Sequence, residues 1–314
     1  MARAVLRSSG QAIRGPLKSR ILRGYQLYLL VLPALCFIVL FVYVPMYGRI
    51  IAFKDFRPHL GVLGSPWVGI KHFLRFFNVP SFWQLIGNTL TLSLYELVAG
   101  FPMPILLAIA MNLIPGQRFK KTVQFITYAP HFISTVVIVG MLSVFLSKNY
   151  GLVNHLVELL GGRRAFFLGR PELFQSLFVW SGVWQNAGWG TIIYLAALSA
   201  IDPQLHEAAI VDGATLWQRM WHVDLPGILP TIVVLLILRT GHLMGVGFEK
   251  VFLMQNALNI ERSEVIATYV YKMGLLNAQY SFASAVELFN AVINFILLLT
   301  VNRLAKALGQ AGLW

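Results

Sequence analysis

Long apolar segments separated by shorter polar ones dominate the pattern along this chain. Six of them are long enough to cross a lipid bilayer, whose core of about 30 Å requires about 20 apolar residues in a helix. Proline inside the second and fifth segments predicts kinks, which transmembrane helices tolerate where neighbouring helices satisfy the freed carbonyls. The pattern predicts an all-α integral membrane protein with six transmembrane helices, at residues 26–46, 84–112, 122–146, 173–199, 226–247 and 281–302.

Composition supports a membrane protein and argues against two other classes. Of the 314 residues, 57% are apolar and 12% are charged, whereas soluble domains carry about 25% charged residues. Disordered chains combine low hydrophobicity with high charge density, which is the opposite of this composition. The net charge of +13 is attributed to topology and lipid headgroups rather than to nucleic acid, because the cations lie between apolar segments.

The N-terminal segment, residues 1–24, sets the expected orientation. It carries six Lys and Arg residues and no Asp or Glu, and such basic flanks stay in the cytoplasm. The apolar run that follows is too long for the core of a cleavable signal peptide, so it is interpreted as the first transmembrane helix. We therefore expect a cytoplasmic basic tail at 1–24, a transmembrane domain at 25–314 and, after six crossings, a cytoplasmic C-terminus.

The loop between the fourth and fifth predicted spans, at about 200–226, has the pattern of two short helices. Asp202 followed by Pro203 is a typical helix start, with an N-cap residue and proline at the first helical position. Gly213 interrupts the helical pattern, and Thr215 is a suitable cap for a second helix. The pattern alone leaves two interpretations open: an interfacial helix on the lipid headgroups, or a docking element for a partner surface.

The same loop carries a long motif: Glu207-Ala208-Ala209, three residues, Gly213, nine residues, then Val223-x-Leu225-Pro226. It resembles the EAA motif of binding-protein-dependent ABC importer permeases, and it departs from that family's pattern only by valine in place of isoleucine. The resemblance covers about 25–314, including segments such as NTLTLSLYELVAGFPMPILLAIAMN and GFEKVFLMQNAL. More narrowly, the chain resembles the carbohydrate-uptake branch for polysaccharide-derived oligosaccharides, of the alginate or pectin-fragment type.

The resemblance implies how such a chain works. It would be a permease subunit in the bacterial cytoplasmic (inner) membrane, paired as a heterodimer with a second homologous permease. Two ABC ATPase subunits, which bind ATP and Mg, and an extracytoplasmic solute-binding protein would complete the transporter. The loop would be a coupling helix that docks on an ATPase subunit, with contacts from Glu207, Ala208, Ala209, Asp212, Gly213, Trp217, Met220, Leu225 and Pro226.

Charged residues inside the predicted spans are candidates for the transport pathway: Glu96, Arg239 and Glu287. A charge near mid-bilayer costs about 2.5–3.5 kcal/mol on insertion scales, so such residues are usually paired or functional. Either Arg239 pairs with one of the glutamates, or it lines a substrate cavity with His242, which shares its helix face three residues further on. Cations in such a cavity suit an anionic sugar such as a uronate oligomer.

The fourth predicted span is rich in aromatic residues, in the segment WSGVWQNAGWGTIIY. Some of these rings face lipid in one interpretation. In the other, Trp189 stacks on the apolar face of a sugar, while Gln185 and Asn186 bind its hydroxyls. The resemblance adds positions, because sugar contacts in disaccharide-transporting members of the family align with Gln185, Asn186, Trp189, Thr240, Leu243, Met244 and Gly247. The side chains differ here, so the resemblance implies that these positions contact the sugar, but not that they make the same interactions.

The predicted function is therefore ATP-driven import of an oligosaccharide by alternating access, with no catalysis, cofactor or metal in this chain. Its sequence holds no P-loop, so a separate subunit or an ion gradient supplies the energy. An ion-coupled secondary transporter or channel subunit is the alternative, but it leaves the helical loop at 200–226 unexplained. A membrane enzyme lacks support, because neither His-Glu-x-x-His nor Gly-x-Ser-x-Gly occurs.

Overall fold

The computed structural model describes residues 25–309 and 312–313, so the basic tail predicted at 1–24 lies outside the described residues. Within these residues the chain is helical apart from connections and one isolated β-bridge between Lys54 and Trp67. The predicted all-α class is therefore confirmed for the described part of the chain. The chain divides into two bodies, Met1–Ile50 and Ile51–Trp314.

The described part of the first body, residues 25–50, is one apolar helical run. Helix α2 (Tyr25–Ile38) continues through a π-helical turn (Val39–Tyr43) into α3 (Val44–Gly48). The whole helical stretch extends over Tyr25–Phe53, and it is long and apolar enough to cross a membrane, with none of its most apolar part buried. Its length and composition agree with the first predicted span.

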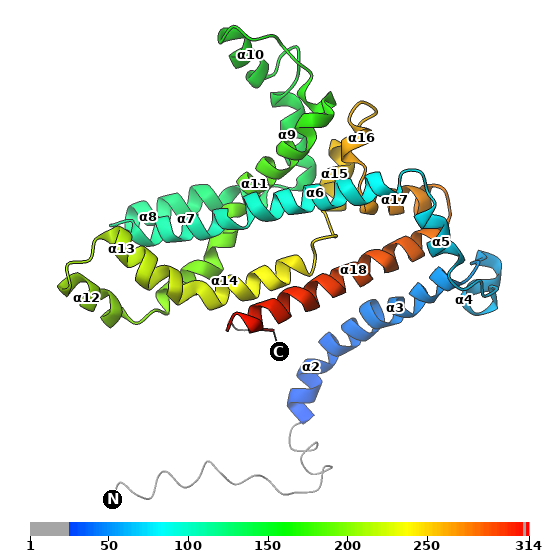
Figure 1. Ribbon diagram of the computed structural model, residues 1–314, viewed down its shortest axis with the longest axis horizontal. Helices are drawn as coiled ribbons and strands as arrows, with labels where there is room; N and C mark the ends of the chain where they lie inside the picture. The colour runs from blue at the N-terminus through cyan, green and yellow to red at the C-terminus, as the bar shows by residue number, and fades with distance from the viewer. Residues whose placement is uncertain (1–24, 310–311, 314) are drawn as a thin grey trace, which may run out of the picture. The chain divides into compact units, whose positions relative to one another are not determined.

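The second body contains the remaining helices. Helices α14 and α18 pack side by side, and Figure 1 shows α12 and α13 at one end of this pair and α5 and α17 at the other. The helices are α4 (Gly61–Gly64), α5 (Lys71–Phe77), α6 (Phe82–Gly100), α7 (Pro102–Leu113), α8 (Gln117–Tyr128), α9 (Thr135–Phe145), α10 (Leu152–Leu159), α11 (Pro171–Ser199), α12 (Pro203–Val211), α13 (Leu216–Arg219), α14 (Leu225–Thr240), α15 (Phe248–Met254), α16 (Ile260–Ser263), α17 (Ile266–Tyr271) and α18 (Tyr280–Ala307).

Four helical stretches of the described chain are long and apolar enough to be membrane spans, and a fifth results if α8 and α9 count as one. Helix α11 is 29 residues long, which matches the predicted fourth span in position. It is not one of the four, because tryptophan, glutamine and asparagine residues lower its mean hydropathy. The four stretches are Tyr25–Phe53, Phe82–Leu113, Leu216–Thr240 and Tyr280–Ala307.

The third predicted span, 122–146, is not one continuous helix. Helices α8 and α9 are separated by a 3-10 turn at Ala129–Phe132 and lie at 97° to each other. Pro130 lacks a backbone donor at this break, and the Ser134 hydroxyl caps α9 by accepting a hydrogen bond from the Val137 N–H at 3.4 Å. A hydrophobicity pattern misses this break because the residues on both sides of it are apolar.

Helix α11 lies at the centre of the second body, where it packs on α6, α7, α8 and α14. Two glycines allow its close approach to neighbouring helices. A Cβ on Gly188 would lie 2.0 Å from the carbonyl oxygen of Thr127 on α8, and a Cβ on Gly190 would lie 2.9 Å from Pro104 on α7. Only a residue without a side chain fits at either contact.

Buried asparagine side chains bind backbone groups where the helices break. Because hydrocarbon provides no hydrogen-bond partner, backbone groups left free at a break need such internal partners. These contacts join the connections between helices to their neighbours. The carboxamides of Asn88, Asn154 and Asn259 donate to the carbonyls of Glu261 and Glu264, of Leu146, Ser147 and Ala165, and of Leu168 and Met254, respectively.

The glycine contact between α11 and α8 gives a stability prediction. In Gly188→Ala, the new methyl group would overlap the α8 backbone, and we expect a loss of about 1–3 kcal/mol, typical of overpacking. Gly140→Ala on α9 is the matched control, because a Cβ there meets nothing within 4 Å. Thermal unfolding of both variants in detergent measures the difference. Equal unfolding temperatures would contradict the close packing of α11 on α8.

Candidate functional site

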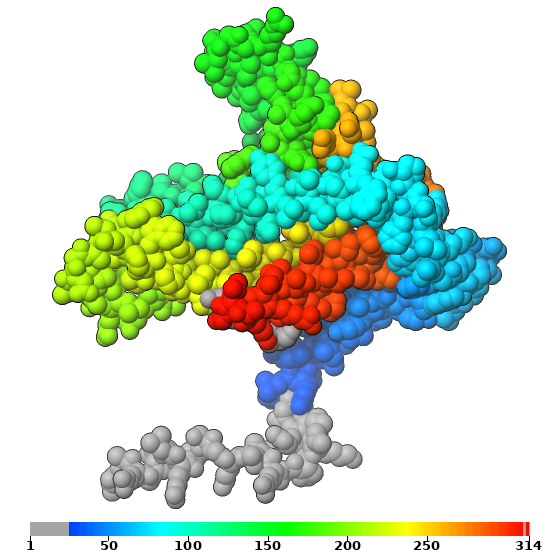
Figure 2. Space-filling view, in the orientation of Figure 1, coloured from blue at the N-terminus to red at the C-terminus, as the bar shows by residue number. Residues whose placement is uncertain are grey.

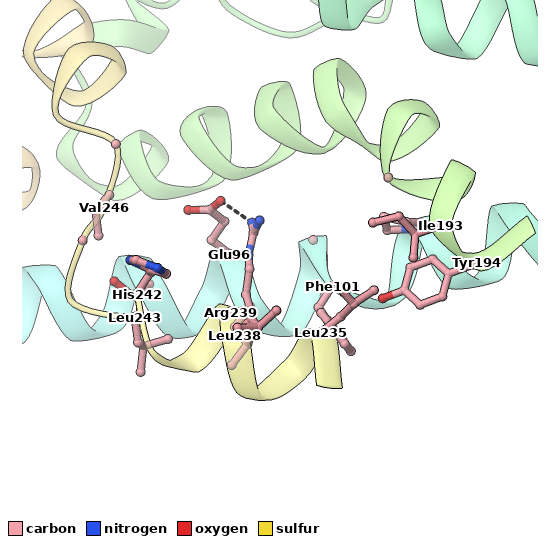
Figure 3. A pocket seen from close by; sticks show the side chains of 17 residues that line it. Glu96, Phe101, Ile193, Tyr194, Leu235, Leu238, Arg239, His242, Leu243 and Val246 are labelled. Carbon is pink, nitrogen blue, oxygen red and sulfur yellow. Dashed lines mark hydrogen bonds and ion pairs between the residues drawn. The ribbon is translucent and has the colours of Figure 1, made fainter. Parts of the chain in front are cut away.

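A cavity of about 490 Å³ lies between α6, α7, α11, α14 and the segment after α14. A second cavity of about 400 Å³ shares Glu96 and Arg239 with it and adds Asn186 and Trp189, so the two adjoin at the charged pair. Figure 3 shows Glu96 and Arg239 pointing toward each other, with His242 and Leu243 further along the same wall.

The charged residues of the cavity form an ion pair. The Arg239 Nη2 donates a hydrogen bond to the Glu96 Oε1 at 2.7 Å, and 52% and 35% of the two side chains remain accessible. Arg239 therefore pairs with a glutamate, as one interpretation of the sequence expects, and the pair also lines a cavity; that this cavity takes substrate stays a prediction. The third charged candidate, Glu287, lines a different cavity on α18.

An aromatic and amide cluster forms the neighbouring wall. The indole of Trp189 stacks on the His131 ring with centroids 4.6 Å apart and an interplanar angle of 5°. The His131 Nδ1 and the Asn186 Oδ1 are 3.0 Å apart. His131 belongs to the turn that separates α8 from α9, so the break in the third predicted span brings this ring to α11.

The candidate pathway residues divide into two groups. Those that line the two cavities are Asn186, Trp189, Arg239, His242, Leu243 and Gly247. The other three side chains are engaged elsewhere. Gln185 donates to the Ile133 carbonyl at 2.8 Å, the Thr240 hydroxyl donates to carbonyls of its own helix, and Met244 is buried in an apolar cluster.

Sequence reasoning missed several cavity residues on α6. Ser93, Glu96, Leu97 and Gly100 all line the larger cavity, and their spacing of three, four and seven residues places them on one helix face. The sequence already makes Glu96 a pathway candidate, and this spacing then identifies Ser93, Leu97 and Gly100 as its neighbours on the cavity face. His131 had no such signal, because its position depends on the bend between α8 and α9.

The loop at 200–226 forms two helices, as the sequence predicts. Asp202 caps α12 by accepting a hydrogen bond from the Gln204 N–H at 3.0 Å. Thr215 and Gln218 form a capping box at the start of α13, in which each side chain binds the other residue's backbone. Both predicted caps are thus confirmed. In the space-filling view, this loop is the yellow-green region at one end of the second body (Figure 2).

Gly213 ends α12 in a left-handed turn. Its φ is +75°, a conformation that glycine adopts without steric cost. The Ala214 N–H donates to the Ala209 carbonyl and the Gly213 N–H to the Ile210 carbonyl, which is the pattern of a Schellman motif. The glycine therefore sets the angle between α12 and α13.

A buried carboxylate ties the loop to the transmembrane helices. Asp224, only 1% exposed, precedes α14. Its Oδ1 lies 3.4 Å from the Nε2 of His206 on α12 and accepts a hydrogen bond from Asn112 at the end of α7 at 3.5 Å. Asp224 thus joins α12 to the end of α7 and the start of α14.

The motif residues of the loop differ in exposure. Glu207, Ala208, Asp212, Gly213, Trp217 and Pro226 are exposed, and Ala209 is half-buried. Met220 and Leu225 are half-buried and pack against the core formed by α7, α11 and α14. The exposed apolar surface of the loop therefore does not come from Met220 and Leu225, and it includes Trp217, Trp221 and Val211.

Long apolar helices around a cavity that holds an ion pair, with a helical loop joined to their ends, fit the membrane subunit of a transporter. The family of binding-protein-dependent transport system inner membrane components matches residues 100–310, and the chain belongs to this family. It is the non-catalytic membrane permease subunit of an ABC importer, whose ATPase is on a separate chain and which works with a solute-binding protein.

Individual relatives match almost the whole chain. The polygalacturonan/rhamnogalacturonan transport system permease protein YteP of Bacillus subtilis (strain 168) is 47% identical over 295 residues, which cover 94% of this chain and 92% of that protein. Protein LplB of the same organism is 43% identical over 292 residues, 93% of this chain and 92% of that protein.

Solved structures agree. A chain of a bacterial ABC transporter involved in the import of the acidic polysaccharide alginate matches with a TM-score of 0.86 and 42% identity. The match covers 93% of this chain and 98% of that chain. The family resemblance found in the sequence is confirmed, and the alternative of an ion-coupled transporter or channel is set aside.

The Arg239–Glu96 pair predicts a measurable coupling between the two side chains. In a double-mutant cycle of Arg239→Gln and Glu96→Gln, we expect a coupling of about 0.5–1 kcal/mol, since water in the cavity screens a partly accessible pair. Thermal unfolding of the two single variants and the double variant in detergent measures it. Strictly additive losses would mean that the two side chains do not interact.

Proposed function

We propose that this chain is a six-span permease that passes a carboxylate-bearing oligosaccharide through the cavity at Arg239, with both termini in the cytoplasm. The observation that carries the proposal is a cavity of about 490 Å³ with a cation, an imidazole and polar backbone along one wall. Its volume is in the range of about 300–1,000 Å³ that ligand sites occupy.

Contacts between connections support six crossings, because connections on the same side of the membrane should touch each other. Asn112, before the connection from α7 to α8, reaches Asp224, near the end of the loop at 200–226. Both connections belong to the cytoplasmic side in the proposed topology. Asn88, near the start of α6, instead binds the carbonyls of Glu261 and Glu264, and both of these segments belong to the outer side. Helix α11 has 29 residues, so at 1.5 Å per residue it is about 43 Å long, enough to cross a bilayer.

The cavity walls offer groups that suit a charged sugar. A sugar ring offers apolar C–H faces to the exposed edge of the Trp189–His131 stack and hydroxyls to the Asn186 carboxamide. Arg239 supplies the donors that bind a planar carboxylate. The relatives named for polygalacturonan and alginate support a uronate oligomer as the substrate. The six cavity-lining candidates remain the proposed pathway residues, and Gln185, Thr240 and Met244 would then support the wall from behind.

Coupling to the ATPase is assigned to α12, α13 and the exposed motif residues between Glu207 and Trp217. The exposed indole of Trp217, at 66%, has the character of an interface anchor, and the exposed Glu207 offers a carboxylate on α12. The contact between His206 and Asp224 would carry motion of the docked loop into α7 and α14. A second, homologous permease would supply the other half of the pathway, and the partial exposure of Arg239 and Glu96 leaves the charged pair accessible to it.

The substrate assignment predicts a selective loss on removing the Arg239 cation. In the reconstituted transporter, Arg239→Met should lower uptake of trigalacturonate about tenfold or more, which corresponds to about 1.4 kcal/mol, and leave a neutral trisaccharide less affected. Arg303→Met on α18 is the matched control, because Arg303 is exposed and lines neither cavity. Equal losses for both sugars, or no uptake of trigalacturonate by the wild type, would refute the uronate assignment.

The coupling assignment predicts variants that insert normally but no longer link ATP hydrolysis to transport. Gly213→Asp strains a left-handed turn and adds a charge, and Glu207→Arg reverses a charge on the docking face. Both should lose most sugar uptake while the complex still hydrolyses ATP. Gly116→Asp is the control: Gly116 also has positive φ and open space around it, but it lies before α8. Wild-type uptake by both loop variants would remove the coupling role.

A further inference from the structure

Arg239 is not a free cation in this structure, because Glu96 already neutralises it. A substrate carboxylate that reaches Arg239 must therefore compete with a carboxylate of the protein itself. The pair is joined by one hydrogen bond, from Nη2 to Oε1. A guanidinium can hold a carboxylate through two parallel hydrogen bonds, which are stronger and more directional. A substrate carboxylate that forms two hydrogen bonds with Arg239 can therefore replace Glu96.

A second cation lies behind the cavity wall. Lys250 on α15 is 8% exposed, and its Nζ donates to the Phe178 carbonyl of α11 at 2.8 Å and lies 4.7 Å from the Phe178 ring centroid. Among the described residues, no carboxylate forms an ion pair with it. An ammonium group has three donors, so Lys250 retains capacity for a carboxylate.

The ammonium group is separated from the smaller cavity by a glycine. A Cβ on Gly182 would lie 3.2 Å from the Lys250 Nζ, and Gly182 lines the same cavity as Glu96 and Arg239. The backbone at Gly182 thus leaves the lysine close to the cavity without a side chain between them. Burial lowers the pKa of Lys250 to about 8, and the Glu96 carboxylate opposes that lowering. Lys250 thus borders, through Gly182, the cavity that Glu96 and Arg239 line.

The charge balance of the three groups is incomplete. Two cations, Arg239 and Lys250, stand against one carboxylate, Glu96, which leaves the cluster one negative charge short of neutral. A buried cation without an anionic partner is costly. One carboxylate from outside would complete the balance, with each cation then holding one carboxylate. A neutral sugar offers no such gain.

We propose that Glu96 is an internal counter-ion which the carboxylate of a uronate displaces from Arg239, and that the displaced Glu96 is received by Lys250. This inference rests on the proposed function, since it concerns how the same cavity selects a carboxylate over a neutral sugar. Arg239 exchanges Glu96 for the substrate carboxylate. Lys250 exchanges the Phe178 carbonyl for the Glu96 carboxylate. No charge is left unpaired at the end of the exchange, and the pair re-forms when the sugar leaves.

The test compares trigalacturonate with its methyl ester, in which each carboxylate is neutralised by one added methyl group. Half-saturating concentrations for uptake are measured in vesicles with the complete transporter, including the partner permease, ATPases and binding protein. The ratio of the two values is compared between variants, so that the unchanged preference of the binding protein cancels. Glu96→Gln removes the competitor, and the preference for the carboxylate should rise about fivefold or more.

Two further variants separate displacement from a packing role. Glu96→Asp keeps the charge but shortens the side chain, which weakens its pair with Arg239, and should raise the preference by a smaller factor. Lys250→Met removes the receiving cation, and should lower the preference about fivefold. Glu287→Gln is the matched control, because Glu287 is an acid in another apolar helix but lines a separate cavity; its ratio should equal that of the wild type.

The outcomes distinguish this inference from the proposed function. If the wild type does not import trigalacturonate, the uronate assignment itself is wrong. If the wild type imports it with preference over the ester, but Glu96→Gln and Glu96→Asp leave the ratio unchanged, then Glu96 does not compete with substrate and the exchange is refuted. If Glu96→Gln does not assemble, Glu96→Asp and Lys250→Met decide the question with opposite expected shifts.

Discussion

Hydrocarbon offers no hydrogen bond to a free backbone group, and the arrangement of this chain follows from that constraint. Continuous helices satisfy it by themselves. Each break needs another partner, and asparagine supplies it repeatedly. Asn290 and Asn294 on α18, for example, bind the carbonyl and the N–H of Met244 where α14 ends. The segment after α14, which forms part of the cavity wall, is thereby held in a defined path.

The same constraint explains where polar chemistry is concentrated. The cavity lies where α14 ends and where α11 meets the turn between α8 and α9, so its walls already contain interrupted backbone. Charged side chains such as Arg239 and Glu96 find water and each other in such a place, whereas they would be costly on a lipid-facing helix. Selectivity for a charged sugar can then arise from groups that the protein must accommodate in any case.

Sequence alone gives the class of the fold, most helix positions and the local form of the loop at 200–226. The caps at Asp202 and Thr215 and the turn at Gly213 were predictable because they depend on neighbours in sequence. The break at Ala129–Phe132 was not, because an apolar pattern continues through it. The hydrogen bonds of Gln185 and Thr240 to backbone carbonyls were not predictable either, because the sequence of a helix does not show which segment packs against it. The ion pair of Arg239 was expected, but the choice of Glu96 over Glu287 depends on three-dimensional packing.

The caps of α12 and α13 have a consequence for association. Each helix of the loop closes its own first turn, through Asp202 in one case and through Thr215 and Gln218 in the other. The left-handed residue at Gly213 is likewise satisfied within the loop. The loop therefore has its shape before any partner arrives, and a partner surface need not supply the entropy of ordering it. In the proposed contact with the ATPase, binding strength is then available for holding the complex together during repeated cycles of movement.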